Sequence, residues 1–365
     1  MVPGGGSVMG AAEAPVGTIQ LVQAGLGRWG RNWAREVLPE VGEVRPVGWA
    51  DPSPTSLSLG QQDSGLPPER CFPTLEKAIA AADGAVDAAL VTTDLPHHAE
   101  TVRAALEAGL HVLVEKPFAT SVAEGRELVE LAERRGRILM VSQNYRFHGV
   151  VRQVAELVRG AELGQVDEVA IDFRRLSEHA EDGPRRHHLE EQPLLVDMSI
   201  HHFDLLRLVL GSEARRVDCR TWNPGWSGFS GPPAGAALIE FANGVVVSYR
   251  GSWVSRGEIT PWSGEWRMQC RGGEIQWAGR GDRGARLERL HIRRREGGAG
   301  AAFKEEDVTL APLGYQDRAG ALHEFAQAIL QGRAPETSGR DNLGTLALMD
   351  AAVTSAAQGA PVDLP

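Results

Sequence analysis

Cysteine is scarce in this chain of 365 residues. The three cysteines, Cys71, Cys219 and Cys270, are widely spaced and form no C-x-x-C pair, which excludes a disulfide framework and a zinc ribbon. So few cysteines fit a reducing compartment, and we therefore expect a cytoplasmic protein. The chain also lacks any apolar run long enough to cross a bilayer, so we expect no membrane partner.

Positive charge is also in deficit. The net charge of -10 at pH 7 argues against a surface that binds nucleic acid. With 42% hydrophobic and 24% charged residues, the composition is that of a globular protein, and the length suggests two domains. Residues 1–17 are rich in glycine and alanine, without a basic segment or an apolar core, so we expect a flexible tail rather than a signal peptide.

A glycine-rich turn follows the first strand-like segment, 18–23, and precedes a helical pattern. The six residues of the turn are Gly25, Leu26, Gly27, Arg28, Trp29 and Gly30. In a G-x-G-x-x-G dinucleotide site, the glycines allow a tight turn, close approach of a pyrophosphate, and packing of the helix on the sheet. Asp51 ends the next strand-like segment, about twenty residues on, where a carboxylate binds the adenosine ribose. We predict a dinucleotide site here, with a structural turn as the alternative.

The first part of the chain alternates strand-like and helix-like segments, which predicts a doubly wound parallel sheet, a Rossmann domain over 18–145. We expect strands at 18–23, 44–50, 86–92, 111–114 and 138–142, helices at 28–38, 74–82, 97–108 and 121–135, and a proline-rich loop at 51–73. Ligands of such sheets lie at the carboxyl ends of the strands. The polar residues and the proline expected there are Thr92, Thr93, Glu115, Lys116 and Pro117. For Glu115 and Lys116, a surface ion pair is the alternative to a chemical role.

The pattern changes at residue 146, where we expect a second domain, 146–365. A helix at 149–160 precedes strand-like segments at 166–175, 215–222, 235–242, 244–253, 264–270, 273–278, 286–294 and 306–310, and helices at 317–331 and 341–358 follow. Asn243 and Gly244 between two such segments indicate a hairpin. This order predicts an α+β domain with a large open, mostly antiparallel sheet.

A helical segment at 194–210 carries three polar residues on one face: Asp197, His201 and Asp204 at positions i, i+4 and i+7. A histidine near a carboxylate titrates close to neutral pH, which suits a general base. The alternative is an aspartate at the positive end of a helix dipole and a buried core histidine. The nearby His187 and His188 have no recognised metal-ligand spacing, so we predict no metal site.

Taken together, these motifs resemble the glucose-fructose oxidoreductase / inositol dehydrogenase / MocA (Gfo/Idh/MocA) family of nicotinamide-dependent oxidoreductases. The resemblance extends from residue 18 to the C-terminus and is carried by the glycine turn, His98-Ala99-Glu100, Glu115-Lys116-Pro117 and Asp197-Met-Ser-Ile-His201. It implies that Lys116 holds the reacting hydroxyl, that His201 is the acid/base, and that Asp197 positions His201 or the substrate. It also implies a homodimer or homotetramer formed through the open sheet. The chain departs from the family pattern at Asp94, where proline is usual, and at Ser199, where glycine is usual.

The resemblance predicts an NAD(P)-dependent oxidoreductase that moves hydride between nicotinamide and a secondary hydroxyl or keto group of a sugar, cyclitol or related polyol. We expect NAD rather than NADP, because the charge of Asp51 repels a 2′-phosphate. We also expect His98 to contact the cofactor, and Tyr145, Arg146, His202 and the loop 177–192 to contact substrate. The alternatives are an NAD-dependent glycoside hydrolase and a non-catalytic nucleotide-binding regulator.

Overall fold

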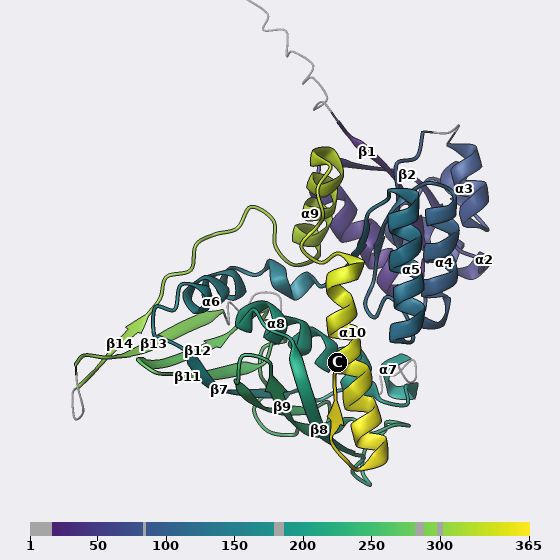
Figure 1. The fold of residues 1–365 in the computed structure, drawn as a ribbon. Coiled ribbons are helices and arrows are strands. Elements are labelled where there is room, and N and C mark those ends of the chain that lie inside the picture. The colour runs from purple at the N-terminus through teal and green to yellow at the C-terminus, as the bar shows by residue number, and fades with distance from the viewer. Residues whose placement is uncertain (1–16, 83–84, 179–185, 282–287, 298–301) are drawn as a thin grey trace, which may run out of the picture.

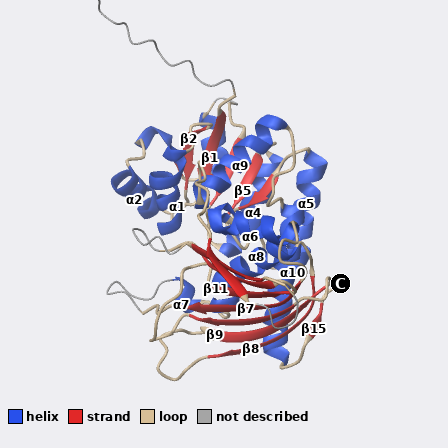
Figure 2. Ribbon diagram, turned by 90° about the vertical axis from the view of Figure 1, so that its left-hand side faces the viewer, coloured by secondary structure: helices blue, strands red, loops and turns tan. Residues whose placement is uncertain are grey.

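The computed structural model describes residues 17–82, 85–178, 186–281, 288–297 and 302–365. The tail predicted over 1–17 lies outside these ranges except for Gly17, and so do residues 179–185 of the loop 177–192. The described residues form a six-stranded and a nine-stranded sheet, which lie in separate parts of the molecule (Figures 1 and 2). This arrangement confirms the predicted fold class.

The six-stranded sheet is parallel throughout, with strand order β3-β2-β1-β4-β5-β6. Its strands are β1 (Ile19–Ala24), β2 (Val44–Ala50), β3 (Cys71–Phe72), β4 (Ala88–Val91), β5 (His111–Val114) and β6 (Leu139–Val141). Its helices are α1 (Arg28–Asn32), α2 (Pro54–Ser64), α3 (Leu75–Ala81), α4 (Leu95–Glu107) and α5 (Val122–Arg135), with short helical turns at Trp33–Val37, Leu38–Glu40 and Pro68–Arg70. Alternate residues of each strand face opposite sides of the sheet, so a hydrophobic core forms on each face. One core includes α4 and α5, and the other includes the residues that follow α1.

Helix α2 corrects the prediction of a loop over 51–73. The prolines of this segment suggested irregular structure, but Pro54 occupies the first helical turn, where its missing N–H costs no hydrogen bond. The Ser53 side chain caps the helix by accepting a hydrogen bond from the N–H of Ser56. Gly65 then ends it in a left-handed conformation with φ of 64°.

The nine-stranded sheet has the order β14-β13-β12-β11-β7-β10-β9-β8-β15. Its strands are β7 (Val166–Arg174), β8 (Ala214–Trp222), β9 (Ala234–Phe241), β10 (Val246–Ser252), β11 (Glu265–Cys270), β12 (Gly273–Ala278), β13 (Arg289–Arg295), β14 (Phe303–Asp307) and β15 (Val362–Asp363). The pairing is antiparallel except between β10 and β7. The hairpin predicted at Asn243 and Gly244 is confirmed, because Gly244 has the positive φ of 88° that the turn requires.

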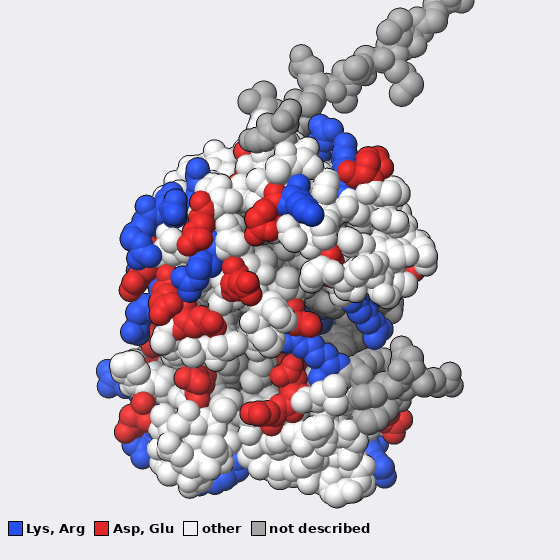
Figure 3. All heavy atoms as spheres, turned by 90° about the vertical axis from the view of Figure 1, so that its right-hand side faces the viewer, with Lys and Arg blue, Asp and Glu red and all other residues white. Residues whose placement is uncertain are grey.

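Helices cover the face of this sheet that is turned toward the six-stranded sheet (Figure 1). They include α6 (Gly149–Arg159), α8 (Ile200–Leu210) and α10 (Gly339–Gln358), while α7 (Arg186–Leu189) lies apart, and short helical turns occupy Asn144–Phe147 and Leu194–Ser199. Helix α9 (Asp317–Gln331) returns to the first sheet and joins its α1-side core. On the face shown in Figure 3, the surface is hollowed between the two parts of the molecule, and acidic and basic side chains are interspersed on this face. No helix within the described ranges is long and apolar enough to span a membrane.

Candidate functional site

The glycine turn at the end of β1 has the close contacts that a dinucleotide site needs. Gly25 has φ of 98°, and a Cβ there would lie 2.5 Å from the backbone of Thr92. A Cβ on Gly30 would lie 2.1 Å from the carbonyl oxygen of Gly25, so the helix can approach the turn only with glycine at this position. A Cβ on Gly27 would have no heavy atom within 4 Å, so the backbone there is open to a ligand. The turn therefore fits a pyrophosphate group.

Asp51 follows β2 beside this turn, as predicted. Its Oδ2 accepts a hydrogen bond from the N–H of Leu26 at 2.7 Å, and its Oδ1 accepts one from the N–H of Ser53 at 2.8 Å. Each carboxylate oxygen retains a second lone pair that can accept from a ribose hydroxyl. Of the remaining turn residues, Arg28 and Trp29 are exposed to solvent.

The ends of β4 and β5 also lie at this edge. Thr92 supports the turn by donating to the carbonyl oxygen of Gly25 at 2.7 Å, while Thr93 Oγ1 is buried with no hydrogen-bond partner in the described chain. Glu115 Oε1 accepts from the indole N–H of Trp33 at 2.7 Å, which ties β5 to the helical turn after α1. The peptide bond between Lys116 and Pro117 is cis. Thus Thr93 has a buried hydroxyl without a partner among the described residues, whereas Thr92 and Glu115 hold the edge together.

His98, which we expected to contact the cofactor, has both ring nitrogens close to backbone carbonyl oxygens. Its ring nitrogens lie 2.7 Å from the carbonyl oxygen of Pro117 and 2.8 Å from that of Thr93, and the residue is 2% exposed. Burial lowers the pKa of His98, although both carbonyl contacts oppose this effect. The imidazole therefore joins the turn after β4 to the turn after β5, and its contact with a cofactor stays a prediction.

Lys116 and Asp197 form an ion pair between the two parts of the molecule. The Lys116 Nζ donates to Asp197 Oδ1 at 2.9 Å and to the Asp197 carbonyl oxygen at 2.7 Å. Burial alone would raise the pKa of the Asp197 carboxyl, but the Lys116 ammonium outweighs burial and the pKa falls below its usual value. The predicted pair of residues is thus brought together, with Asp197 positioning Lys116 rather than His201.

The helix that carries Asp197 and His201 is not a continuous α-helix. Residues Leu194–Ser199 form a π-helical turn, and the α-helix α8 begins only at Ile200. A π-helical turn has wider spacing than an α-helix, which changes the faces on which flanking residues lie. Asp204, predicted on the same face as His201, is 1% exposed and pairs with Arg146 instead.

His201 lies close to Lys116 and Arg280 and is stacked on Tyr145. The two ring centroids are 4.0 Å apart with an interplanar angle of 2°. His201 is 6% exposed, and its Nδ1 is buried without a hydrogen-bond partner among the described residues, which leaves Nε2 as the more accessible ring nitrogen. Burial lowers the pKa of His201 well below its usual value, and the positive charges of Lys116 and Arg280 lower it further. At neutral pH the imidazole is therefore uncharged and able to accept a proton.

Two predicted substrate contacts lie in the interior instead. His202 is fully buried, with its ring nitrogens 3.1 Å from the hydroxyl of Tyr249 and 3.0 Å from the carbonyl oxygen of Trp262. Arg146 donates to both carboxylate oxygens of Asp204, at 2.6 and 2.7 Å, and is 4% exposed. These contacts hold both side chains in the interior, and the substrate contacts expected of them stay a prediction.

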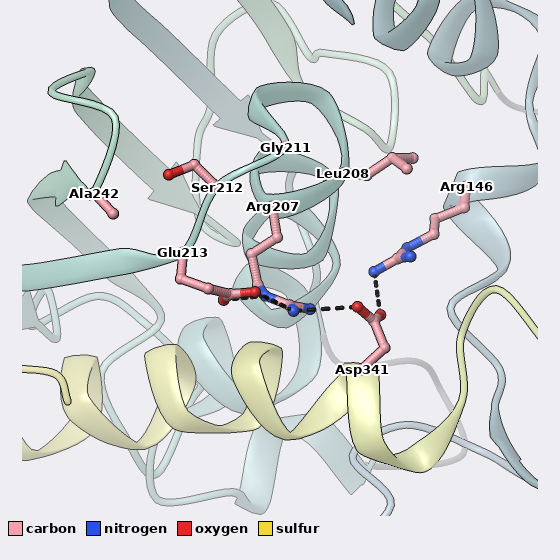
Figure 4. Close-up of a pocket in the computed structure, with 8 residues that line it drawn as sticks. All are labelled: Arg146, Arg207, Leu208, Gly211, Ser212, Glu213, Ala242 and Asp341. Carbon is pink, nitrogen blue, oxygen red and sulfur yellow. Dashed lines mark hydrogen bonds and ion pairs between the residues drawn. The ribbon is translucent and has the colours of Figure 1, made fainter.

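Figure 4 shows a separate surface recess of about 480 Å³ next to α8 and the start of α10. Arg207 there donates to both carboxylate oxygens of Glu213 at 2.6 Å, and Asp341 bridges Arg207 and Arg146. Because these charges are paired with one another, the recess lacks an available charged group for a ligand. Its ion pairs hold α8 against α10.

Two residues near His201 were not predicted. Arg280 follows β12, and Asp317 begins α9; they form an ion pair at 3.2 Å. Neither belongs to a motif, and only the tertiary fold brings them to Tyr145 and His201. Among the described residues, no group of three or more histidine, cysteine or acidic side chains is arranged to hold a metal ion.

Comparison with known proteins gives matches over most of the chain. Residues 19–143 match the model of the oxidoreductase family with an NAD-binding Rossmann fold, and residues 151–276 match the Gfo/Idh/MocA C-terminal domain. The chain is 27% identical to D-apiose dehydrogenase of Paraburkholderia graminis, covering 75% of this chain and 72% of that protein. It is 25% identical to inositol 2-dehydrogenase of Rhizobium meliloti, covering 93% and 98%.

A solved structure shares the fold. It is an oxidoreductase from Agrobacterium radiobacter in complex with NAD+, L-tartaric acid and magnesium, with a TM-score of 0.79 and 22% sequence identity. The match covers 94% of this chain and 98% of that chain. At this identity the likeness shows a common fold.

Proposed function

The chain belongs to the Gfo/Idh/MocA family of oxidoreductases, and from this premise we propose that it is an NAD-dependent dehydrogenase acting on a secondary hydroxyl of a sugar, cyclitol or related polyol. The observation that carries the proposal is the meeting of Lys116, Asp197 and His201 at the edge of the sheet that holds the glycine turn. The curated relatives named above act, by their names, on a sugar and on a cyclitol.

Each of the three residues has a separate task in this proposal. NAD, when bound, supplies the hydride acceptor. His201 accepts the hydroxyl proton at Nε2, since its low pKa keeps the imidazole uncharged at neutral pH. The Lys116 ammonium stabilises negative charge that develops on the reacting oxygen. Asp197 fixes the Lys116 side chain through the 2.9 Å ion pair.

The preference for NAD over NADP depends on Asp51. Its carboxylate is 8% exposed and is oriented by the backbone N–H groups of Leu26 and Ser53. A 2′-phosphate at the adenosine ribose would place a second negative charge against it, which costs free energy in a poorly solvated site. We therefore propose NAD as the working cofactor.

The outer face of the nine-stranded sheet supports the proposal of a homodimer or homotetramer. Along β9 and β10, alternate residues are exposed on this face, and they include Leu238 at 49% and Val246 at 37%. These two apolar side chains lie among polar neighbours, Glu240, Ser248 and Arg250, and such a mixed surface is what non-obligate protein interfaces have.

The test is to record the absorbance of reduced nicotinamide after the protein is mixed with NAD and inositols, aldoses or amino sugars. Formation of reduced nicotinamide with one class supports the dehydrogenase and identifies that class. Cleavage of an aryl glycoside without net reduction of NAD would instead indicate the hydrolase. Lys116→Ala should abolish most turnover while NAD binding persists, and Lys77→Ala, at an exposed lysine of α3, is the matched control. Full activity of Lys116→Ala would refute the proposal.

A further inference from the structure

Three planar groups from distant parts of the chain lie in one stack. The His201 imidazole lies parallel to the Tyr145 ring at 4.0 Å, and the Arg280 guanidinium lies over the Tyr145 ring, 4.5 Å from its centroid. Arg280 also donates a hydrogen bond from Nη1 to the Tyr145 hydroxyl at 3.1 Å. Tyr145 is therefore held on both its face and its hydroxyl.

The stack is what fixes the orientation of His201. A general base must point its nitrogen at the substrate proton, and a neighbouring carboxylate or carbonyl commonly holds the ring. Within the described ranges His201 makes no such hydrogen bond, and its Nδ1 is buried without a partner. Asp197, the nearest predicted candidate, is bonded to Lys116. The parallel Tyr145 ring, 4.0 Å away, is therefore the contact that can set the plane of the imidazole.

Arg280 is itself held in a strained conformation. Its φ is 54°, and its ion-pair partner Asp317 also has φ of 54°, the left-handed region that non-glycine residues rarely adopt. Such a conformation persists only where the surrounding structure enforces it, commonly at functional sites. Asp317 also accepts a hydrogen bond from Asn144, the neighbour of Tyr145. The arrangement therefore fixes Arg280 against Tyr145 from two directions.

We propose that Arg280 is a positioning residue of the active site, which holds the Tyr145 ring against the His201 imidazole and so orients His201 Nε2 for proton transfer. This inference rests on the proposed dehydrogenase function. In this role Arg280 acts through Tyr145 and touches neither substrate nor cofactor.

The charge of Arg280 has a second consequence for His201. The charged or titratable groups around the imidazole come from six elements or turns: Lys116 after β5, Tyr145 in the Asn144–Phe147 turn, Asp197 in the π-helical turn, His202 in α8, Arg280 after β12 and Asp317 at the start of α9. Lys116 and Arg280 both lower the pKa of His201, after burial, and the aspartates that pair with them offset only part of their charge. Removal of the Arg280 charge should raise this pKa.

The experiment compares Arg280→Gln with Arg280→Lys, which keeps the charge but not the planar group. Arg256→Gln is the matched control, because Arg256 also stacks on an aromatic ring, 4.3 Å from the centroid of Trp226, on another loop. The first readout is the imidazole titration of His201 by NMR in the protein without cofactor, assigned with His201→Gln. The second is the pH profile of kcat/KM.

We expect Arg280→Gln to raise the pKa of His201 by on the order of one pH unit, and Arg280→Lys to leave it close to wild type. Both variants should lower the plateau of kcat/KM by roughly tenfold or more, because both lose the fixed ring. Arg256→Gln should change neither readout.

An unchanged titration in Arg280→Gln, together with a plateau within about twofold of wild type, would overturn the inference. If the wild-type protein turns over no polyol, the proposed function fails, while the titration still tests the effect of the Arg280 charge on His201. If Arg280→Gln does not fold, Tyr145→Phe keeps the ring and removes the hydroxyl bonded to Arg280. An unchanged plateau in Tyr145→Phe would then contradict the inference, and a lowered plateau would support it.

Discussion

The ion pair between Lys116 and Asp197 gives the sharpest prediction for catalysis. Asp197→Asn retains the size and the hydrogen-bond acceptor but removes the negative charge beside the Lys116 Nζ, 2.9 Å away. Two unit charges about 4 Å apart attract by about 4 kcal/mol at an effective dielectric constant of about 20. Because the Asp197 side chain is 37% exposed, solvent screening lowers this to about 1–2 kcal/mol. A loss of that size corresponds to about a tenfold fall in rate.

The assay is steady-state oxidation of the substrate identified in the panel, with kcat and KM determined for substrate and for NAD. We expect kcat to fall by about tenfold in Asp197→Asn, because Lys116 is less firmly placed at the reacting oxygen. The KM for NAD should change little, since Asp51 and the glycine turn are untouched. Asp350→Asn, at an exposed position of α10, controls for the loss of a surface charge. A kcat equal to that of wild type would refute the role given to the ion pair.

Three further predictions concern the cofactor, stability and assembly. Asp51→Ser should weaken NAD binding and improve NADP binding relative to NAD by about tenfold; titration with both nucleotides checks this, and an unchanged ratio contradicts it. Burial lowers the pKa of His202 to about 4 in the folded protein, whereas the unfolded chain has a histidine pKa of about 6.5. Below about pH 6.5 the unfolded chain therefore binds a proton that the folded protein does not. The free energy of unfolding should fall by about 3 kcal/mol as the pH drops from above 6.5 to 4. In urea unfolding, the free energy of unfolding should fall less between these pH values in His202→Gln than in wild type, and an equal fall in both proteins would exclude the effect. Leu238→Glu should reduce the molecular mass in light scattering to that of the monomer, whereas an unchanged oligomer would place the interface elsewhere.

The cofactor end of the site was predictable from sequence because a parallel sheet aligns the carboxyl ends of its strands. The positions of Gly25, Asp51 and Lys116 therefore followed once the strands were assigned, and the structure places all three at one edge. The loop predicted over 51–73 was wrong for a local reason. Prolines indicate irregular structure on average, but Pro54 directly after the cap Ser53 instead starts a helix.

The substrate end was less predictable, because it depends on helical phase and on tertiary contacts. A π-helical turn shifts Asp197 relative to His201, so the i, i+4 argument did not apply. The sequence also offered His201 and its neighbour His202 as alternatives. Only the structure shows that His202 is fully buried, whereas His201 keeps 6% of its surface exposed. Arg280 could not be found at all, because its contact with Tyr145 joins residues 135 positions apart.

The two departures from the family pattern have structural counterparts. Ser199, in place of the usual glycine, has its hydroxyl 2.8 Å from that of Tyr249, which in turn contacts His202, so the added side chain lies in a polar cluster beneath α8. Asp94, in place of the usual proline, pairs with Arg186 of α7 at 2.8 Å. Both partners of that pair are about half exposed or more, at 69% and 48%, and such ion pairs contribute at most about 1 kcal/mol. The turn after β4 is thus joined to α7 by an exposed and weak contact, whereas in the pair between Lys116 and Asp197 the lysine side chain is only 13% exposed.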